Sequence, residues 1–277
     1  MHDLKDKNII ITGGAGLLGT EHGFATAQAN GVPILVDIST HRLAAAAQSI
    51  HQRLPDARVE TRVADITNRE AVAALRDDIE ANVGAVHCVI NNAAVNTTPV
   101  ASDNIADQDA RATGDFETFP ITDWNHEIAV GLTGALIMCQ VFGPPMARAG
   151  CGSIVNISSE LGIGAPDHRV YENVETMDDV TVFKAVSYSV VKTGLIGLTR
   201  YLATYWGHRG VRCNALVPGG VWNGHDDEFT RTLALRAPMG RMANKDDFHD
   251  AIVFLCSEGS AYMNGQILVM DGGRSVW

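Results

Sequence analysis

Short apolar segments rich in β-branched residues recur along the chain, and alanine-rich segments separate them. Apolar segments of about four to eight residues, bounded by turn-forming residues, are typical of strands buried on both faces. The segments that predict strands are Lys7 to Thr12, Val32 to Asp37, Arg58 to Ala64, Val86 to Asn91, Gly152 to Ser158, Val211 to Val217 and Gln266 to Met270. The intervening segments predict helices, for example Arg42 to Leu54 and Arg69 to Glu80.

The alternation of strands and helices predicts the fold class. It indicates an α/β protein with a doubly wound, seven-stranded parallel sheet of the Rossmann type and helices on both faces. Ligands of such a sheet bind beyond the carboxyl ends of the strands. Because the sequence shows no internal repeat, low-complexity linker or domain boundary, residues 1–277 are expected to form a single domain.

Two polar stretches are too long for ordinary connections between a strand and a helix. They run from Asn96 to Thr122 and from Gly164 to Lys184. Loops of this length usually cover an active site or are disordered. We therefore expect substrate-loop insertions near 96–122 and 164–184.

Charge and hydropathy narrow the possible partners. The formal net charge is -11, from 21 basic and 32 acidic residues, which argues against nucleic acid or an anionic membrane surface as a partner. The longest uncharged window, Ile128 to Ala147, contains glycines and prolines and predicts a buried or intersubunit helix rather than a membrane span. No basic N-terminal region leads into an apolar stretch, so no signal peptide is expected.

The cysteines and histidines show no pattern of a disulfide framework or a metal site. The five cysteines are scattered without a CxxC pair, and the ten histidines contain no HExxH or similar ligand spacing. We therefore expect no bound metal and a reduced, cytoplasmic environment.

A glycine cluster follows the first predicted strand and opens a helix. In the segment TGGAGLLG, Gly13 permits a tight turn, Gly16 lets the backbone approach a pyrophosphate, and Gly19 lets the helix pack on the strand. This position within a strand–helix–strand unit predicts a dinucleotide site. The alternative is an ordinary strand-to-helix turn.

Asp37 ends the second predicted strand, eighteen residues after Gly19. A carboxylate there can accept hydrogen bonds from the adenosine ribose hydroxyls and would repel a 2′-phosphate, which favours NAD over NADP. Two alternatives stay open. Asp37 could instead cap the following helix, and Arg42 could favour NADP.

Tyr188 and Lys192 form a candidate proton-transfer pair. A spacing of four residues places both side chains on one face of a helix, one turn apart. A phenol has a pKa of about 10, and an adjacent ammonium favours the phenolate. We therefore expect Lys192 to lower the pKa of Tyr188, so that Tyr188 can move a proton to or from a hydroxyl or carbonyl.

These landmarks together resemble the short-chain dehydrogenase/reductase family over nearly the whole chain. The further matching segments are Asp65 after the third strand, Asn91 to Ala94 after the fourth, Ile157 to Ser159 after the fifth, Pro218 and Gly219 after the sixth, and the terminal Asp271 to Gly273. The resemblance is specific for the family and says little about the substrate.

The resemblance implies a role for each matching residue. Ser159 would hold the reacting oxygen, with Ser158 as the alternative, Tyr188 would be the acid–base group, and Lys192 would tune Tyr188 and hold the nicotinamide ribose. The implied cofactor contacts are Gly13, Gly16, Leu17, Leu18, Gly19, Asp37, Asp65, Ile66, Asn91, Ala93, Tyr188, Lys192, Pro218, Gly219 and Val221. Asp65 and Ile66 would lie against the adenine.

The sequence departs from the family pattern at three places. Gly131 stands where the family often has an asparagine that holds a water in the proton relay, so either a water or another residue substitutes, or proton exchange is slower. Ser159 precedes Tyr188 by 29 residues, a wider spacing than is usual, and the extra residues are expected to form a lid or substrate wall. The threonine often found after Pro-Gly is absent, and Gly220 to Gly224 stands instead.

The insertion and the segment after Pro218 are similar to one subgroup, the bacterial oxidoreductases associated with sugar biosynthesis for flagellin glycans. Candidate substrate contacts are Ser159, Glu160, Tyr188, Trp222 and Asn223, which would line a polar pocket. The alternative for Glu160, Trp222 and Asn223 is that they are solvated loop residues.

We interpret the sequence as an NAD-dependent oxidoreductase that interconverts a secondary alcohol and a ketone on a polar substrate such as a sugar derivative. The alternatives are a less polar alcohol, ketone or acyl substrate, or a catalytically silent dinucleotide-binding sensor. The resemblance also implies a homo-oligomer, a dimer or tetramer, with apolar faces from Ile128 to Met146 and Tyr188 to Trp206.

Overall fold

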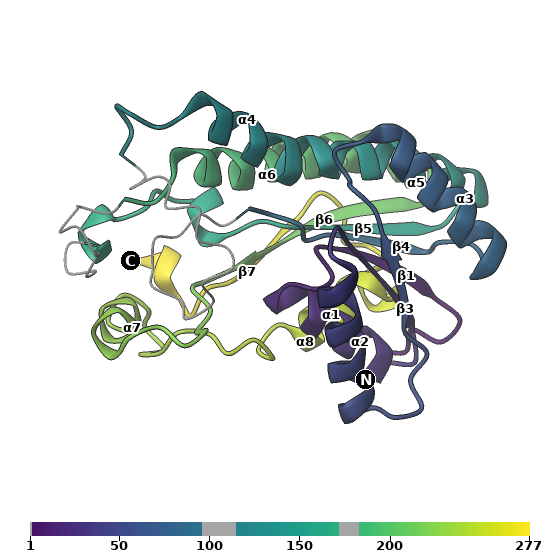
Figure 1. Ribbon diagram of the computed structural model, residues 1–277, viewed down its shortest axis with the longest axis horizontal. Helices are drawn as coiled ribbons and strands as arrows, with labels where there is room; N and C mark the ends of the chain where they lie inside the picture. Colours follow the sequence, from purple (N-terminus) through teal and green to yellow (C-terminus); the bar gives the residue numbers. More distant parts are fainter. Residues whose placement is uncertain (1, 96–114, 172–182) are drawn as a thin grey trace.

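The computed structural model describes residues 2–95, 115–171 and 183–277 (Figure 1). A seven-stranded parallel sheet in the order β3-β2-β1-β4-β5-β6-β7 forms its centre, which confirms the predicted fold class. The strands are β1 (Asn8–Thr12), β2 (Val32–Asp37), β3 (Glu60–Val63), β4 (Cys88–Asn91), β5 (Gly152–Ile157), β6 (Val211–Pro218) and β7 (Ile267–Met270).

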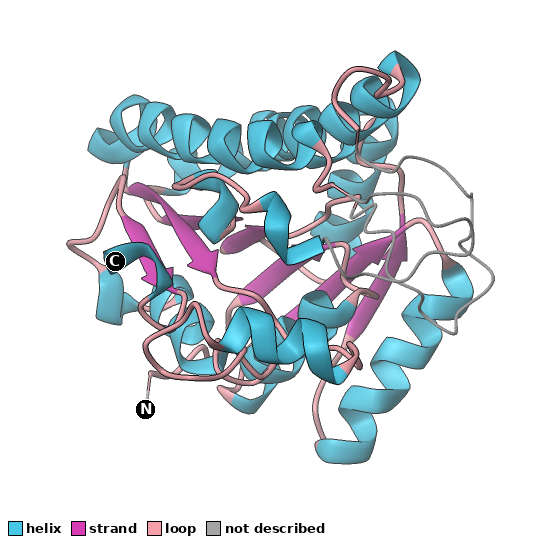
Figure 2. Ribbon diagram, turned by 90° about the vertical axis from the view of Figure 1, so that its left-hand side faces the viewer, coloured by secondary structure: helices cyan, strands magenta, loops and turns pink. Residues whose placement is uncertain are grey.

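Helices cover both faces of the sheet, as Figures 1 and 2 show. One face carries α3 (Arg69–Asn82), α5 (Gly134–Ala149) and α6 (Val186–Trp206), and the other carries α1 (Leu17–Gln28), α2 (Thr40–Arg53) and α8 (His249–Cys256). The other α-helices of the described residues are α4 (Ile121–Ile128) and α7 (Asp227–Ala234).

The side chains on the two faces of the sheet pack into two separate hydrophobic cores. Along β1, Ile9 and Ile11 are fully buried with α1, α2 and α8, whereas Ile10 is fully buried with α3, α5 and α6. Successive side chains of a strand point to opposite faces, so a strand packed by helices on both sides must be apolar at every position. This is why the buried strands are continuous apolar runs in the sequence.

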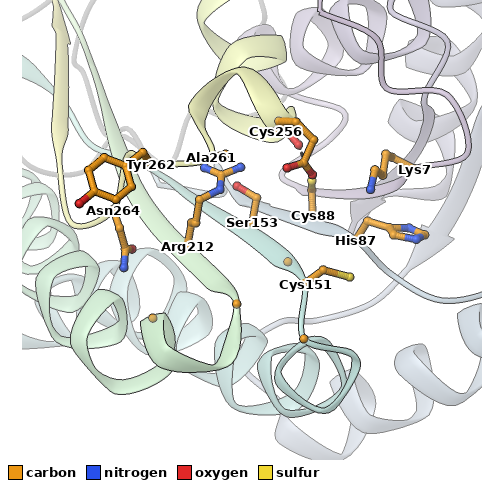
Figure 3. A pocket seen from close by; sticks show the side chains of 15 residues that line it. Lys7, His87, Cys88, Cys151, Ser153, Arg212, Cys256, Ala261, Tyr262 and Asn264 are labelled. Atoms are coloured by element: carbon orange, nitrogen blue, oxygen red, sulfur yellow. Dashed lines mark hydrogen bonds between the residues drawn. The ribbon is translucent and has the colours of Figure 1, made fainter.

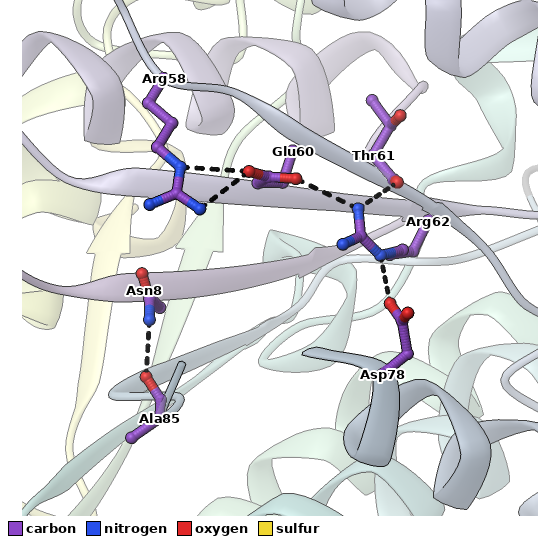
Figure 4. Close-up of polar contacts among 7 residues, drawn as sticks. All are labelled: Asn8, Arg58, Glu60, Thr61, Arg62, Asp78 and Ala85. Carbon is purple, nitrogen blue, oxygen red and sulfur yellow. Dashed lines mark hydrogen bonds and ion pairs between the residues drawn. The ribbon is translucent and has the colours of Figure 1, made fainter. Parts of the chain in front are cut away.

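The third strand is shorter than the sequence predicts because it lies at the edge of the sheet. It pairs with β2 alone, and it covers Glu60–Val63 rather than Arg58 to Ala64. Figure 4 shows the polar network along it, in which Glu60 accepts hydrogen bonds from Arg58 and Arg62, while Arg62 also pairs with Asp78 on α3. Charged side chains on an edge strand disfavour pairing with another chain.

The uncharged window lies within one long helical stretch, Ile121–Ala149, which passes from α4 through a π-helical turn, η2 (Ala129–Thr133), into α5. It is apolar and long enough to cross a membrane by length and composition, but half of its most apolar window is buried inside the fold. Phe142 and Met138 of α5 are almost fully buried against the sheet. The burial favours the expected core helix.

The strand order reverses between β1 and β4, which lie side by side although α1, β2, α2, β3 and α3 separate them in sequence. The loops after β1 and β4 therefore leave the sheet in opposite directions. In an open parallel sheet this point is where ligands bind.

Candidate active site

The glycine turn between β1 and α1 is packed backbone against backbone. Gly13 has a φ of +60°, which favours glycine, and a Cβ at this residue would lie 2.8 Å from Ala93 Cα. A Cβ at Gly19 would overlap the carbonyl oxygen of Gly13. The structure therefore requires glycine, which has no Cβ, at both positions.

The start of α1 fits a pyrophosphate. Its N-cap is Gly16, and no side chain caps the helix. The first amides of a helix have no intrahelical partner and carry partial positive charge, so an anion is their natural ligand. Leu17 and Leu18 contribute such amides, and the predicted dinucleotide fits this cradle.

Asp37 is fixed at the carboxyl end of β2 by backbone donors. Its carboxylate accepts hydrogen bonds from the amides of Ala15, at 3.3 Å, and Ser39, at 3.2 Å. The N-cap of α2 is Ser39, which accepts from the Arg42 amide, and not Asp37. The carboxylate therefore faces the glycine turn.

Two exposed apolar side chains beside Asp37 were not identified from the sequence. Ile38 is 74% exposed and Val63, the strand partner of Asp37, is 56% exposed. Apolar side chains exposed at the carboxyl end of a parallel sheet offer a surface on which an adenine ring can stack. Asp65 is exposed beyond β3, whereas the Ile66 side chain is buried against Gly134 of α5.

The asparagines after β4 have different roles. The Asn91 side chain is buried and donates to Asn156 Oδ1 at 2.8 Å, so it faces the sheet interior and only its backbone reaches the cofactor edge. Asn92 donates to the carbonyls of Thr12 and Gly13 and thereby holds the glycine turn. The sequence analysis did not single out Asn92, because its role depends on a contact across 80 residues.

The structure brings Ser159, Tyr188 and Lys192 together beyond the carboxyl end of β5. The Ser158 hydroxyl donates to the Lys192 carbonyl at 2.7 Å, so it is occupied in joining β5 to α6. The Ser159 side chain hydrogen-bonds to Tyr188. Lys192 Nζ donates to the Ile157 carbonyl at 2.8 Å and lies 5.5 Å from the centroid of the Tyr188 ring.

The net direction of the Tyr188 pKa differs from the expectation. Burial raises the pKa of Tyr188 and the charge of Glu160 adds to this, while the hydrogen bond with Ser159 opposes it. Burial also lowers the pKa of Lys192 to about 8, with a contribution from the charge of Lys184. The prediction of a lowered tyrosine pKa was therefore wrong, because desolvation of the buried phenol has the largest effect on its pKa.

The candidate substrate residues differ in their exposure to solvent. Burial raises the pKa of Glu160, whose carboxylate lies 3.5 Å from Arg274 Nε. Trp222 is 51% exposed and Asn223 is also exposed, both between β6 and α7. Val221 pairs with Ala243 directly after Pro218 and Gly219, where the family resemblance places a cofactor contact.

Tyr171 is a further site residue that the sequence analysis did not single out. It ends a 3-10 turn, η4 (His168–Tyr171), and its ring packs on Phe229 of α7 with centroids 5.9 Å apart. Burial and the proximity of Tyr188 raise the pKa of Tyr171 to about 12. This part of the predicted insertion thus forms a wall beside Tyr188. Residues 96–114 and 172–182 of the two predicted insertions lie outside the described residues.

Gly131 occupies a position that leaves no room for a side chain. It lies in the π-helical turn η2, and a Cβ at this residue would lie 2.5 Å from Val191 Cγ1 of α6. An asparagine could therefore not be placed here without displacing the Val191 side chain. The departure from the family pattern is therefore built into the packing.

A separate cavity of about 500 Å³ lies at the amino ends of the strands, opposite to the candidate active site (Figure 3). Cys88, Ser153 and Arg212 line it, and each stands at the amino end of its strand. It is therefore remote from the glycine turn and Tyr188, which lie at the carboxyl ends. Within the described parts of the chain, no three His, Cys, Asp or Glu side chains converge as metal ligands do.

Two sequence models of known families match the chain. The model described as short chain dehydrogenase matches residues 7–172, which include the glycine turn and Ser159. The model described as Enoyl-(Acyl carrier protein) reductase matches residues 175–275, which include Tyr188 and Lys192. The matched regions therefore cover both halves of the site.

Individual proteins are similar over nearly the whole chain. A D-threitol dehydrogenase from Mycolicibacterium smegmatis is 29% identical over 283 residues, 99% of this chain and 94% of that protein. A galactitol 2-dehydrogenase (L-tagatose-forming) from Cereibacter sphaeroides is 33% identical over 273 residues, 96% of this chain and 94% of that protein. A crystal structure of a gluconate 5-dehydrogenase from Burkholderia cenocepacia J2315, in complex with NADP and tartrate, shares the fold, with a TM-score of 0.80, 24% identity, and coverage of 99% and 97%.

Proposed function

Because this chain belongs to the short-chain dehydrogenase/reductase family, and is therefore an NAD(P)-dependent oxidoreductase acting on alcohol groups, we propose that it uses NAD to interconvert a secondary alcohol and a ketone on a sugar or sugar derivative. The observation that carries the proposal is the convergence of Ser159, Tyr188 and Lys192 at the sheet edge that also holds the glycine turn.

The roles of the site residues follow from their chemistry. Ser159 donates a hydrogen bond to the reacting oxygen and fixes it beside Tyr188. Tyr188 Oη accepts the proton of the alcohol during oxidation and returns it to the carbonyl oxygen during reduction. Lys192, as a nearby ammonium, favours the phenolate of Tyr188. The bound nicotinamide would supply the acceptor or donor of the hydride.

The polar substrate class is supported by the relatives and by the site. The two curated relatives described above act on sugar alcohols, as their names state. Glu160 and Tyr171 offer an acceptor and a donor to substrate hydroxyls close to Tyr188. Such groups are left unpaired by an apolar alcohol, which costs binding free energy.

The proposed cofactor preference is tested by fluorescence titration with NADH and NADPH. We expect NADH to bind at least about tenfold more tightly, because the Asp37 carboxylate would repel a 2′-phosphate by roughly 1.4 kcal/mol or more. Asp37→Ser should reduce this preference to within about threefold. Asp56→Ser, which changes the net charge equally at an exposed loop position, is the control. Tighter binding of NADPH would assign the selection to Arg42, and binding of neither would contradict the cofactor site.

The proposed substrate class is tested by NAD-linked oxidation of galactitol and D-threitol, with 2-octanol as an apolar secondary alcohol of the same reaction class. We expect kcat/KM for one of the polyols to exceed that for 2-octanol by at least about 100-fold, because an unpaired polar group in the site costs about 1–3 kcal/mol. The reverse order would favour the alternative of a less polar substrate.

A second candidate function is the reduction of an acyl substrate, which the match of residues 175–275 to an Enoyl-(Acyl carrier protein) reductase model favours. Reduction by NADH of a crotonyl thioester, which is an enoyl compound, and of an acetoacetyl thioester, which is a ketone, measured beside the polyols, separates the two. A protein that binds NADH and turns over none of these compounds would instead fit the sensor alternative.

We also propose a homo-oligomer. The outer face of α6 exposes Tyr201 and Tyr205, whose stacked rings are 63% and 55% exposed, and Leu136 of α5 and Val190 of α6 are partly exposed as well. Apolar and aromatic side chains gathered on two neighbouring helices are typical of subunit interfaces.

A further inference from the structure

A second lysine lies beside the candidate acid–base tyrosine. Lys184 Nζ is 4.1 Å from the centroid of the Tyr188 ring, whereas Lys192 Nζ is 5.5 Å from it. Lys184 is 8% exposed and stands two residues before α6 begins. An ammonium above an aromatic ring is attracted by the ring electrons, and more strongly when water is excluded. Its attraction to a phenolate is stronger still, because the ring then carries a full negative charge.

The charge of a buried carboxylate on the neighbouring helix attracts this ammonium. Glu127 of α4 is 3% exposed, and its Oε2 accepts a hydrogen bond from the hydroxyl of Ser187, which is fully buried. Burial lowers the pKa of Lys184 to about 8, and the attraction of Glu127 opposes this. Glu127 therefore helps to keep Lys184 charged near neutral pH.

The location of this charge is hard to explain by stability alone. A buried ion pair generally stabilises a protein no more than well-packed apolar residues of the same volume. The π-helical turn η2, which continues α4, packs on α6, and a Cβ at Gly131 would lie 2.5 Å from Val191 Cγ1. Position 131 therefore offers no polar side chain to Tyr188, whereas the Lys184 ammonium is adjacent to the ring.

We propose that Lys184, attracted by the charge of Glu127, is a positioning residue that stabilises the phenolate form of Tyr188. The proposal rests on the proposed role of Tyr188 as the acid–base group. Lys184 acts through the tyrosine ring and is assigned no contact with the substrate.

Several charged groups face Tyr188 besides Lys184. Lys192 lies one turn along the same helix and favours the phenolate, while Glu160 after β5 and Tyr171 of η4 disfavour it. Glu127 acts through Lys184, and Arg274 partly offsets the charge of Glu160. The test must therefore change Lys184 and leave these groups in place.

The test measures ionisation of Tyr188 directly in the folded protein. The chain has five tyrosines, so protein made with a ring-fluorinated tyrosine has separate fluorine NMR signals for each, and the signals missing from Tyr188→Phe identify residue 188. A polyfluorinated ring is used, because residue 188 must ionise below a pH of about 8, where Lys184 is still charged. We expect Lys184→Met to raise the pKa of residue 188 by about one unit or more, because a nearby positive charge is lost.

Two further variants separate charge from structure. Lys184→Arg keeps the positive charge and should restore a pKa close to that of the parent, which a purely structural role for the side chain would not predict. Lys245→Met removes an equal charge from Glu21, on the other side of the sheet, and should leave residue 188 unchanged. If Lys184→Met fails to fold, Lys184→Met with Glu127→Leu removes both charges and is titrated in its place.

The outcomes decide the proposal independently of the substrate. An unchanged pKa in Lys184→Met, or an equal shift in Lys184→Arg, would overturn it. The same titration is valid even if no polyol is oxidised, so failure of the proposed function appears only in the turnover screen. Where turnover is measurable, Lys184→Met should lower kcat about tenfold at pH 7 and recover towards the parent value at higher pH.

Discussion

Tyr188→Phe is expected to lower kcat by about 10²–10⁴-fold while NADH binding stays within about twofold of the parent. The substitution removes only the hydroxyl that exchanges a proton with the reacting oxygen. The phenyl ring stays beside Lys184 and Lys192, so the packing of the site is preserved. The measurement is steady-state turnover of the best polyol from the screen, beside a fluorescence titration with NADH.

The control for this variant is Tyr201→Phe. Tyr201 lies on the same helix, α6, and is 63% exposed on its outer face, so its hydroxyl has no part in the site. It should keep the parent kcat. Turnover that survives in Tyr188→Phe would mean that another group transfers the proton, and Tyr171, whose ring is buried close by, would then be the next residue to change.

Gly19→Ala is expected to weaken NADH binding by at least about 100-fold and to lower the free energy of unfolding by about 1–3 kcal/mol. The added methyl group would overlap the Gly13 carbonyl, which is backbone and cannot rotate away. The start of α1 must therefore shift, and the amides that would bind the pyrophosphate shift with it. Fluorescence titration measures the first effect and urea denaturation the second.

Gly197→Ala provides the matched comparison, because the same methyl group is added to a glycine in a helix. No atom lies within 4 Å of a Cβ at Gly197, which is exposed on α6. We expect it to raise the free energy of unfolding by about 0.5–1 kcal/mol, as alanine fixes a helix at lower entropic cost than glycine. NADH binding should not change. Loss of binding in both variants, or in neither, would contradict the role given to the glycine turn.

The buried strands and the cofactor turn could be predicted because their signals are local. A strand covered on both faces must be apolar throughout, as Ile9, Ile10 and Ile11 are. The turn at Gly13 needs a left-handed backbone, and Gly19 needs a missing Cβ, so each requirement is met by one residue type. Such features are visible in the sequence wherever they occur.

The bounds of the edge strand and the surroundings of the proposed adenine site could be predicted less well than the buried strands and the glycine turn. The third strand is shorter than expected because pairing on one side only leaves its ends free. Ile38 and Val63 looked like ordinary apolar positions in the sequence. Only the register of β2 and β3 places them together at the exposed edge beside Asp37.

The sequence by itself determined the doubly wound sheet, the position of the dinucleotide turn, and the pairing of Tyr188 with Lys192 one helical turn away. Only the tertiary structure decided the electrostatics around Tyr188. Burial raises its pKa, Lys184 approaches its ring from the segment before α6, and Glu127 of α4 acts on Lys184. The physical reason is that strand pattern and turn geometry depend on neighbours in sequence, whereas desolvation and charge interactions depend on distances between segments that folding brings together.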